Sequence, residues 1–228
     1  MTTAKLAFPW YVHPALAPHD WAWLAAPHRN VSFAVINVHN GPGADNDEYY
    51  PDAVALLRGL RLLGYVRVDY GRRPVEDVTD DIHAWLRRYP VGGIMFDEVP
   101  TAPETFGRCS EYAGAARAAG VSFLAANPGA FPSPSHLDLF DVTAVFEGPA
   151  RTYATFEHPR WARNLRPSSL WHLVYECDSQ QIRTAGRAAG DRGAGHVFAT
   201  DRSLPNPWLG LPTPQSTRLL PVRGTARP

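Results

Sequence analysis

The sequence predicts an α/β protein that folds as a single-domain (β/α)8 barrel of the TIM type. Short apolar runs alternate with amphipathic stretches along almost the whole chain, a pattern typical of βα units around a parallel sheet. The 228 residues fall within the size range of one such barrel. An open doubly wound sheet would usually carry a glycine-rich phosphate loop after its first strand, and the sequence contains no G-x-G-x-x-G motif. These observations favour the barrel.

The elements follow from the same alternation, taken in chain order. Eight apolar runs are predicted to form the strands, at residues 5–13, 32–38, 64–70, 92–98, 121–127, 142–147, 169–176 and 195–201. Amphipathic stretches predict helices at 18–27, 48–63, 75–89, 104–119 and 178–191. The proline-rich stretch 128–141 predicts at most a short helix. We expect residues 1–228 to form one domain, with a C-terminal tail that wraps the barrel and a flexible end at 216–228.

Composition excludes several classes of partner. Lys and Arg number 22, as do Asp and Glu, so no basic surface for nucleic acid or an anionic membrane is expected. No apolar segment is long enough to span a membrane, and the N-terminal residues lack the apolar core of a signal peptide. We therefore expect a cytoplasmic protein, or a secreted one if a leader was removed. Cys109 and Cys177 form no metal-binding spacing or disulfide framework, and the oligomeric state stays open.

Two predicted strands end in carboxylates. The run 92–98 ends in Asp97 and Glu98, and the run 142–147 ends in Glu147. A single acid in such a place is commonly a helix cap. Acids at the ends of two barrel strands instead favour acid/base catalysis, because active sites of these barrels lie at the carboxyl ends of the strands and glycosidases use two facing carboxyl groups. Asp97, Glu98 and Glu147 are therefore the candidate catalytic residues.

Other polar side chains gather at the same predicted strand ends, whereas the strand interiors are almost wholly apolar. A polar surface of this kind suits a hydroxyl-rich ligand, because buried donors and acceptors must be matched. An aromatic side chain nearby can pack against a sugar ring. The candidate substrate-binding residues from these positions are Tyr11, His13, Asn37, His39, Asn40, Asp69, Tyr70, Arg73, Asn127, Glu176, Asp201 and Trp208.

The sequence also allows a weaker, metal-based alternative. His13 and His39 could join Asp97 in a site of two histidines and one carboxylate. The nine histidines, however, contain no H-x-x-x-H or H-x-H pair. No G-x-S-x-G nucleophile motif is present either. We predict an enzyme that needs no metal and no cofactor.

The spacing of the strands fits a two-carboxylate mechanism. The fourth and sixth strands have one strand between them, so their backbones lie roughly 9–10 Å apart. Carboxyl groups that reach toward each other across this gap fall within the ~5–9.5 Å range of retaining and inverting glycosidases, and the sequence does not choose between the two. Asp97 and Glu98 should point to opposite faces of a strand. Either only one of the two carboxylates reaches the site and the other lies behind it, or the chain turns at Glu98 and both carboxylates reach the site.

A series of short motifs runs along nearly the full length of the chain: Pro9-Trp10-Tyr11-Val12-His13-Pro14, Ile36-Asn37, Asn40-Gly41-Pro42-Gly43, Gly64-Tyr65-Val66, Tyr70-Gly71-Arg72-Arg73, Gly93-Ile94-Met95-Phe96-Asp97-Glu98, Asn127-Pro128-Gly129, Phe146-Glu147, Thr200-Asp201 and Asn206-Pro207. In this order they resemble the motifs of the spherulin-4 family. The resemblance implies a (β/α)8 barrel that hydrolyses α-1,4-linked galactosamine-containing polymers. It places the acidic catalytic set at Asp97, Glu98 and Glu147 and adds Asn206 to the binding candidates. The sequence departs from the family pattern at His13, Val38-His39 and Val68.

The leading hypothesis is a metal-independent glycoside hydrolase for an amino-sugar-containing oligosaccharide. Two alternatives stay open: a cytoplasmic small-molecule enzyme (cyclase, lyase or isomerase) that reuses the same acids, and a non-catalytic carbohydrate-binding barrel. Six predicted strand-end acids suggest a negative site for a neutral or amine-bearing ligand. If Glu176 and Asp201 instead form structural hydrogen bonds at the rim, this field is weaker.

Overall fold

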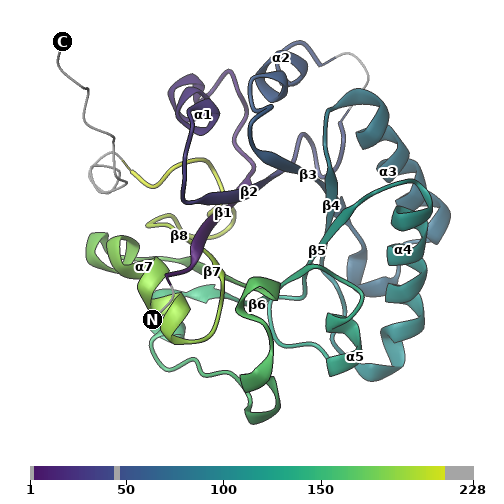
Figure 1. Cartoon of the computed structure of the whole chain (residues 1–228). Helices are drawn as coiled ribbons and strands as arrows, with labels where there is room; N and C mark the ends of the chain where they lie inside the picture. Colours follow the sequence, from purple (N-terminus) through teal and green to yellow (C-terminus); the bar gives the residue numbers. More distant parts are fainter. Residues whose placement is uncertain (1–2, 44–46, 214–228) are drawn as a thin grey trace, which may run out of the picture.

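The predicted barrel is confirmed. The computed structural model describes residues 3–43 and 47–213, and in it eight parallel strands close into a barrel in the order of the chain. The helices lie around the outside of the strands (Figure 1). None of the helices in these two ranges is long and apolar enough to cross a membrane. The predicted flexible end at 216–228 lies outside the described residues.

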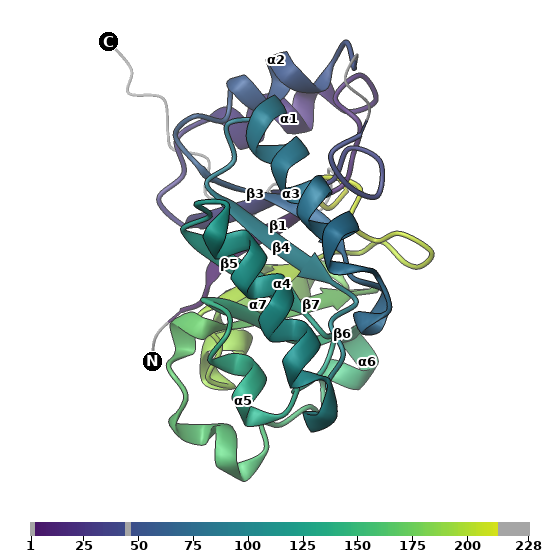
Figure 2. The same cartoon turned by 90° about the vertical axis from the view of Figure 1, so that its right-hand side faces the viewer.

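Each strand is short and leads into an outer segment. The strands are β1 (Lys5–Trp10), β2 (Val31–Ile36), β3 (Arg61–Arg67), β4 (Gly93–Asp97), β5 (Phe123–Asn127), β6 (Val142–Pro149), β7 (Leu170–Tyr175) and β8 (His196–Ala199). The α-helices are α1 (Pro18–Ala25), α2 (Tyr50–Ala55), α3 (Val75–Arg88), α4 (Phe106–Ala118), α5 (Pro134–Leu137), α6 (Ala150–Tyr153) and α7 (Ser179–Asp191). Short 3-10 helices occupy Asp69–Gly71, Pro103–Thr105, Arg160–Asn164 and Pro167–Ser169. The long helices α3 and α4 pack side by side on the outside of the barrel (Figure 2).

One predicted helix and the bounds of two strands were wrong; the third strand both starts and ends three residues earlier than predicted. The helix expected at 48–63 is only α2, and the chain then turns and enters β3 at Arg61 rather than at residue 64. Leu62 and Leu63 pair with β2 and are buried on that strand. A short apolar run fits a buried strand and a helix face equally well, which explains the error. The first strand ends at Trp10 rather than at residue 13, because Tyr11 already hydrogen-bonds to Trp208 through its backbone.

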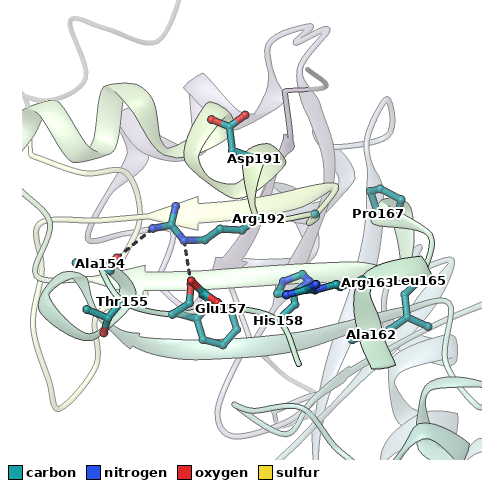
Figure 3. A pocket seen from close by; sticks show the side chains of 12 residues that line it. Ala154, Thr155, Glu157, His158, Ala162, Arg163, Leu165, Pro167, Asp191 and Arg192 are labelled. Atoms are coloured by element: carbon teal, nitrogen blue, oxygen red, sulfur yellow. Dashed lines mark hydrogen bonds between the residues drawn. The ribbon is translucent and has the colours of Figure 1, made fainter. Parts of the chain in front are cut away.

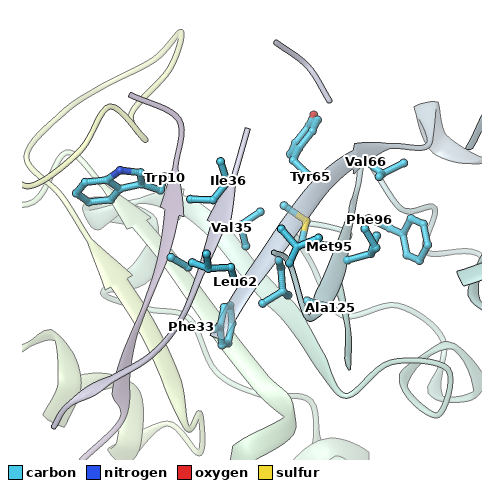
Figure 4. Close-up of a cluster of buried hydrophobic side chains, with 14 of the residues drawn as sticks. Trp10, Phe33, Val35, Ile36, Leu62, Tyr65, Val66, Met95, Phe96 and Ala125 are labelled. Atoms are coloured by element: carbon cyan, nitrogen blue, oxygen red, sulfur yellow. The ribbon is translucent and has the colours of Figure 1, made fainter. Parts of the chain in front are cut away.

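Aromatic side chains fill the amino-terminal end of the barrel. The Phe33 ring lies 5.1 Å from that of Trp171, 6.0 Å from that of Phe123 and 5.3 Å from that of His196. These side chains come from strands that are not all neighbours, so they meet inside the barrel; we call the four of them the inner plug. Phe33 belongs to a buried cluster that continues toward Met95 and Tyr65 (Figure 4). The plug closes the interior below the carboxyl ends of the strands.

Replacing Gly64 with Ala should destabilise the protein. A Cβ atom at Gly64 would lie 2.4 Å from the Trp85 ring, which is held by a 2.8 Å hydrogen bond from its indole N–H to the Tyr65 carbonyl oxygen. Such overpacking typically costs about 1–3 kcal/mol. Gly114→Ala is the matched control, since nothing lies within 4 Å of the added atom in helix α4. Thermal unfolding should show a lower Tm for Gly64→Ala only; an unchanged Tm would contradict the tight packing.

Candidate active site

Two carboxylates share one amide at the carboxyl ends of neighbouring strands. Asp97 ends β4, Asn127 ends β5 and Glu147 lies near the end of β6. The Asn127 Nδ2 group donates to Asp97 Oδ1 at 2.8 Å and to Glu147 Oε2 at 2.5 Å. The two carboxylate oxygens can therefore be no farther apart than these two bonds laid end to end. The predicted convergence of Asp97 and Glu147 is present in the structure.

An irregularity in β6 determines where Glu147 points. Ala144 pairs with Trp171 and Phe146 pairs with His172, so the register shifts by one residue at Val145. Glu147 then lies opposite Leu173, on the same face as Ala144 and Trp171, which is the inside of the barrel. In a regular strand Ala144 and Glu147 would lie on opposite faces, because side chains alternate. The bulge therefore aims the carboxylate at Asp97, a role bulges often have beside active sites.

Burial raises the pKa of both carboxyl groups. Desolvation is the largest cause for Glu147, whose pKa rises to about 7; the hydrogen bond from Asn127 opposes the rise, and the charge of Asp97 adds to it. The pKa of Asp97 is also raised by burial, while hydrogen bonds from Tyr65, the Glu98 backbone and Asn127 favour its ionised form. Two carboxyl groups pushed in this way hold one proton between them near neutral pH. Of the two, Glu147 favours the protonated form, and Asp97, with its three hydrogen bonds, favours the ionised form.

Aromatic side chains enclose the acid pair. The Tyr65 hydroxyl donates to Asp97 Oδ2 at 2.8 Å, and its ring packs edge-on against Tyr11 at 5.4 Å. Desolvation and the neighbouring charges of Asp97 and Glu147 keep the Tyr11 pKa well above its ordinary value. On the other side, Trp208 hydrogen-bonds to Glu147, and its ring lies 6.3 Å from that of Tyr175. The predicted binding residues Tyr11, Asn127 and Trp208 are thus gathered around the acid pair.

Glu98 has a different place from its neighbour. Its φ of 56° turns the chain at the end of β4, as the second of the two arrangements required, but its carboxylate does not join the acid pair. Its carboxylate then accepts a 2.6 Å hydrogen bond from Arg67 Nε, and Arg67 also bonds Asp69 at 2.5 Å. Asp69 is further bound by Arg72. Glu98 is therefore neutralised in an ion-pair network beside the acid pair.

Several other candidates lie farther out, on the loops around this end of the barrel. The Asn37 side chain accepts from the Gly41 backbone at 3.1 Å, and the Asn206 side chain accepts from the Trp208 backbone at 3.1 Å. His13 packs edge-on against Tyr49 and Tyr50. The structure does not bring these side chains to the acid pair. Exposed on the same rim are His39, Asn40 and Tyr70.

Fewer of the six strand-end acids contribute an unpaired negative charge to the site than the sequence suggested. Glu176 is paired with Arg151, and Asp201 accepts hydrogen bonds from the Thr213 backbone and hydroxyl at 3.1 and 2.6 Å. This is the structural role at the rim that the sequence left open for both acids. Arg73 bonds Asp81 at 2.8 Å on helix α3. Of the six acids, Asp97 and Glu147 are the two that have neither an ion pair with an arginine nor bonds to the loop at Thr213 in the described part of the chain.

The metal alternative finds no cluster in the structure. Within residues 3–43 and 47–213, no group of three His, Cys, Asp or Glu side chains is placed to hold a metal ion. His13, His39 and Asp97 accordingly do not gather into a ligand set. The expected absence of a metal or cofactor requirement stays a prediction.

The sequence reasoning missed two residues of the site. Tyr65 and Arg67 lie on β3, where Tyr65 pairs with Met95 and Arg67 pairs with Asp97 in β4. Both sit at alternate positions, so they share the inward face with Asp97. The available signal was an Arg inside an otherwise apolar strand, which would be costly there without acidic partners.

A hollow lies outside the barrel, on the side of β7 and α7. Its volume is about 550 Å³, and its lining includes Glu157, His158, Arg163 and Asp191 (Figure 3). Arg192 also lines it, but its guanidinium donates to the carbonyl oxygens of residues 153, 154 and 156. His158 bonds the buried His172 at 3.0 Å. These side chains hold the β6–β7 connection in place and lie away from the acid pair.

The buried proton of Glu147 has a consequence for stability. A folded pKa of about 7, above the ordinary 4.5, means that stability is complete below 4.5 and falls as the pH rises through 7. Replacing Glu147 with Gln removes this loss. The free energy of unfolding of Glu147→Gln, measured relative to that of the wild type, should therefore rise by on the order of 3 kcal/mol from pH 4.5 to pH 8. Urea unfolding at both pH values measures this; an equal gain in Glu176→Gln would contradict it.

The chain matches a known family over almost its whole length. The family described as spherulation-specific family 4 matches residues 5–217. Spherulin-4 of Physarum polycephalum is 31% identical over 148 residues, which are 63% of this chain and 44% of that protein. The match therefore spans less than half of this relative.

Solved structures share the barrel. Sph3 of Aspergillus clavatus, in complex with GalNAc, matches with a TM-score of 0.76 at 24% identity, covering 96% of both chains. The glycoside hydrolase domain of PelA from Pseudomonas aeruginosa matches with a TM-score of 0.51 at 14% identity, covering 86% of this chain and 96% of that one. The chitinase ICChI from Ipomoea carnea gives 0.52 at 10% identity, over 86% and 94%. The chain has a barrel like that of glycoside hydrolases, and it belongs to the spherulation-specific family 4.

Proposed function

We propose that the protein is a retaining glycoside hydrolase in which Glu147 is the general acid/base and Asp97 the nucleophile. The single observation that carries this is the shared Asn127 amide, with bonds of 2.8 and 2.5 Å to the two carboxylates. It holds their nearest oxygens within about 5 Å, the separation of the carboxyl pair in retaining enzymes. Inverting enzymes need a wider gap for a water molecule.

The proton distribution supports these roles. In the first step, protonated Glu147 donates to the glycosidic oxygen as the bond to C1 breaks, and Asp97 forms an ester with C1. In the second step, Glu147 takes a proton from water, which attacks C1 and releases Asp97. The raised pKa of Glu147 keeps its proton available near neutral pH. The hydrogen bonds to Asp97 stabilise the carboxylate that attacks and leaves.

We further propose that the substrate is an α-linked saccharide containing galactosamine or its N-acetyl form. The family membership and the GalNAc in the Sph3 complex support this class. The unpaired charge of Asp97 favours a neutral or amine-bearing sugar over a uronate or a phosphate. Tyr11 and Trp208 beside the acids offer flat surfaces against which a sugar ring can pack.

The test is hydrolysis of a defined polymer. Incubation with α-1,4-linked galactosamine or N-acetylgalactosamine polymer should release reducing ends, and NMR of the first product should show the α-anomer. Asp97→Asn is the inactive control, and a polyuronate should not be cleaved. Binding of the polymer without cleavage would instead favour a carbohydrate-binding barrel. Release of the β-anomer would refute the retaining mechanism.

The rate should follow a bell-shaped pH profile. The acid must hold its proton, so kcat/KM should fall as the pH rises above about 7, where Glu147 loses it. At low pH the rate should fall as the carboxylate of Asp97 is protonated, at a pH above the ordinary range of aspartate because its pKa is raised. Both limits belong to the coupled pair. A rate that is flat from pH 6 to pH 9 would contradict the role of Glu147.

A further inference from the structure

A second cavity lies at the opposite end of the barrel from the acid pair. Its volume is about 650 Å³, within the range of small-molecule sites. The residues that line it start the strands: Lys5 in β1, Arg61 in β3, Phe123 in β5 and His196 in β8. Phe123 and His196 also belong to the inner plug, so the plug forms its roof and separates it from the acid pair.

The charge of this cavity is unbalanced. Arg117 is paired with Asp141 at 2.7 Å, so these two cancel. Lys5, Arg61 and Arg166 line the cavity without a carboxylate partner in the described part of the chain, and the remaining acid in the lining is Asp138. The lining therefore carries an excess of two positive charges in a chain whose formal net charge is zero.

A buried nitrogen in the lining lacks a partner. His196 is 8% exposed, and its Nε2 atom lies 3.0 Å from the Ser168 carbonyl oxygen, so Nε2 carries the proton that bonds it. The Nδ1 atom of the same ring is buried and has no hydrogen-bond partner. Arg61 lies with its guanidinium 4.4 Å from the centre of the Phe123 ring, which fixes its position at the same wall. The Nδ1 atom is itself closed to solvent, so a ligand in the cavity does not reach it, and the groups that can hold such a ligand are the cationic side chains of the lining.

We propose that this cavity binds a phosphate monoester of sugar-phosphate size. The dianion matches the excess of two charges, and Arg61, Lys5 and Arg166 supply charge-assisted donors for its oxygens. The volume is larger than a phosphate group needs and has room for the organic part of such a molecule. This site is separate from the acid pair and does not depend on the proposed hydrolysis.

Calorimetric titration of the full chain with glucose 6-phosphate tests this, with glucose as the uncharged probe. The wild type should bind one equivalent of the phosphate and no glucose, more weakly as salt is raised. Arg61→Gln and Arg166→Gln should each weaken binding roughly tenfold or more, because a charge-assisted bond is lost. Arg58→Gln is the matched control: Arg58 is exposed, as Arg61 and Arg166 are, but it does not line the cavity, and its replacement removes the same charge.

Each other outcome overturns the proposal. No binding by the wild type would show that the cavity takes no such anion. An equal loss in Arg58→Gln would show only a general effect of charge, and a loss in Asp97→Asn would place the ligand at the acid pair. Equal affinity for inorganic phosphate would show that the sugar part of the ligand contributes nothing to binding, so the cavity would not be a site for a phosphate monoester. Thermal unfolding of each variant confirms that a loss of binding does not come from a loss of folding.

Discussion

Glu147→Gln should lower kcat/KM for the polymer by about 10²–10⁴-fold, the usual contribution of a general acid/base. The amide keeps the size of the carboxyl group and can still bond to Asn127, which donates to Glu147 at 2.5 Å in the wild type. It cannot protonate the leaving oxygen. The first step should therefore recover with an aryl glycoside whose leaving group needs no proton, while the slow second step then limits the rate.

A burst of phenolate followed by slow turnover would identify this state, because the glycosyl ester on Asp97 accumulates. Added azide should accelerate turnover, since it attacks the ester without needing a base. Glu176→Gln serves as control: Glu176 is paired with Arg151 at the rim and should keep nearly wild-type rates. An equal loss with polymer and activated substrate, without a burst, would mean that Glu147 is not the acid.

Substitution of the two adjacent acids should separate their roles. Asp97→Asn should lower kcat/KM on the order of 10⁴-fold or more for every substrate, because no other carboxylate can form the ester. Glu98→Gln should change it by less than about tenfold. Its carboxylate is already bound by Arg67 at 2.6 Å, and a partly exposed ion pair is worth only about 0–1 kcal/mol.

Kinetics with the activated aryl glycoside measures both variants under the same conditions. Azide should not restore the retaining reaction in Asp97→Asn, and any azide adduct should have the inverted configuration. A Glu98→Gln variant as inactive as Asp97→Asn would place Glu98 on the substrate instead. It would also show that its ion pair with Arg67 opens when the substrate binds.

The sequence could predict the barrel because its signals are local. Apolar strands and amphipathic helices each follow from the spacing of a few residues, and eight of them in alternation leave few architectures. The segment at 56–63 was harder. Leu62 and Leu63 continue an apolar helix pattern, and only their pairing with β2, 28 residues earlier, makes them a strand. Such a distant contact leaves no mark on the local period.

The site was predictable in position but not in detail. Asp97, Asn127 and Glu147 could be placed at one end of the barrel because parallel strands bring their carboxyl ends together. The pairing of Glu98 with Arg67 depends on a left-handed turn at Glu98, which a non-glycine residue rarely adopts. The contribution of Tyr65 depends on the register between β3 and β4. These features arise from tertiary contacts, so composition and spacing could not reveal them.

The shifted register at Val145 means that the proposed chemistry depends on the length of β6 as well as on its functional groups. Deleting one residue there would restore regular pairing with β7 and turn the glutamate toward the outer helices, while every acid stayed in the sequence. Among relatives, a motif search for the acids would then count such a protein as an enzyme. If Glu147 acts as we propose, the length of the segment between Ala144 and Glu147 is a better criterion of activity than the presence of the glutamate alone.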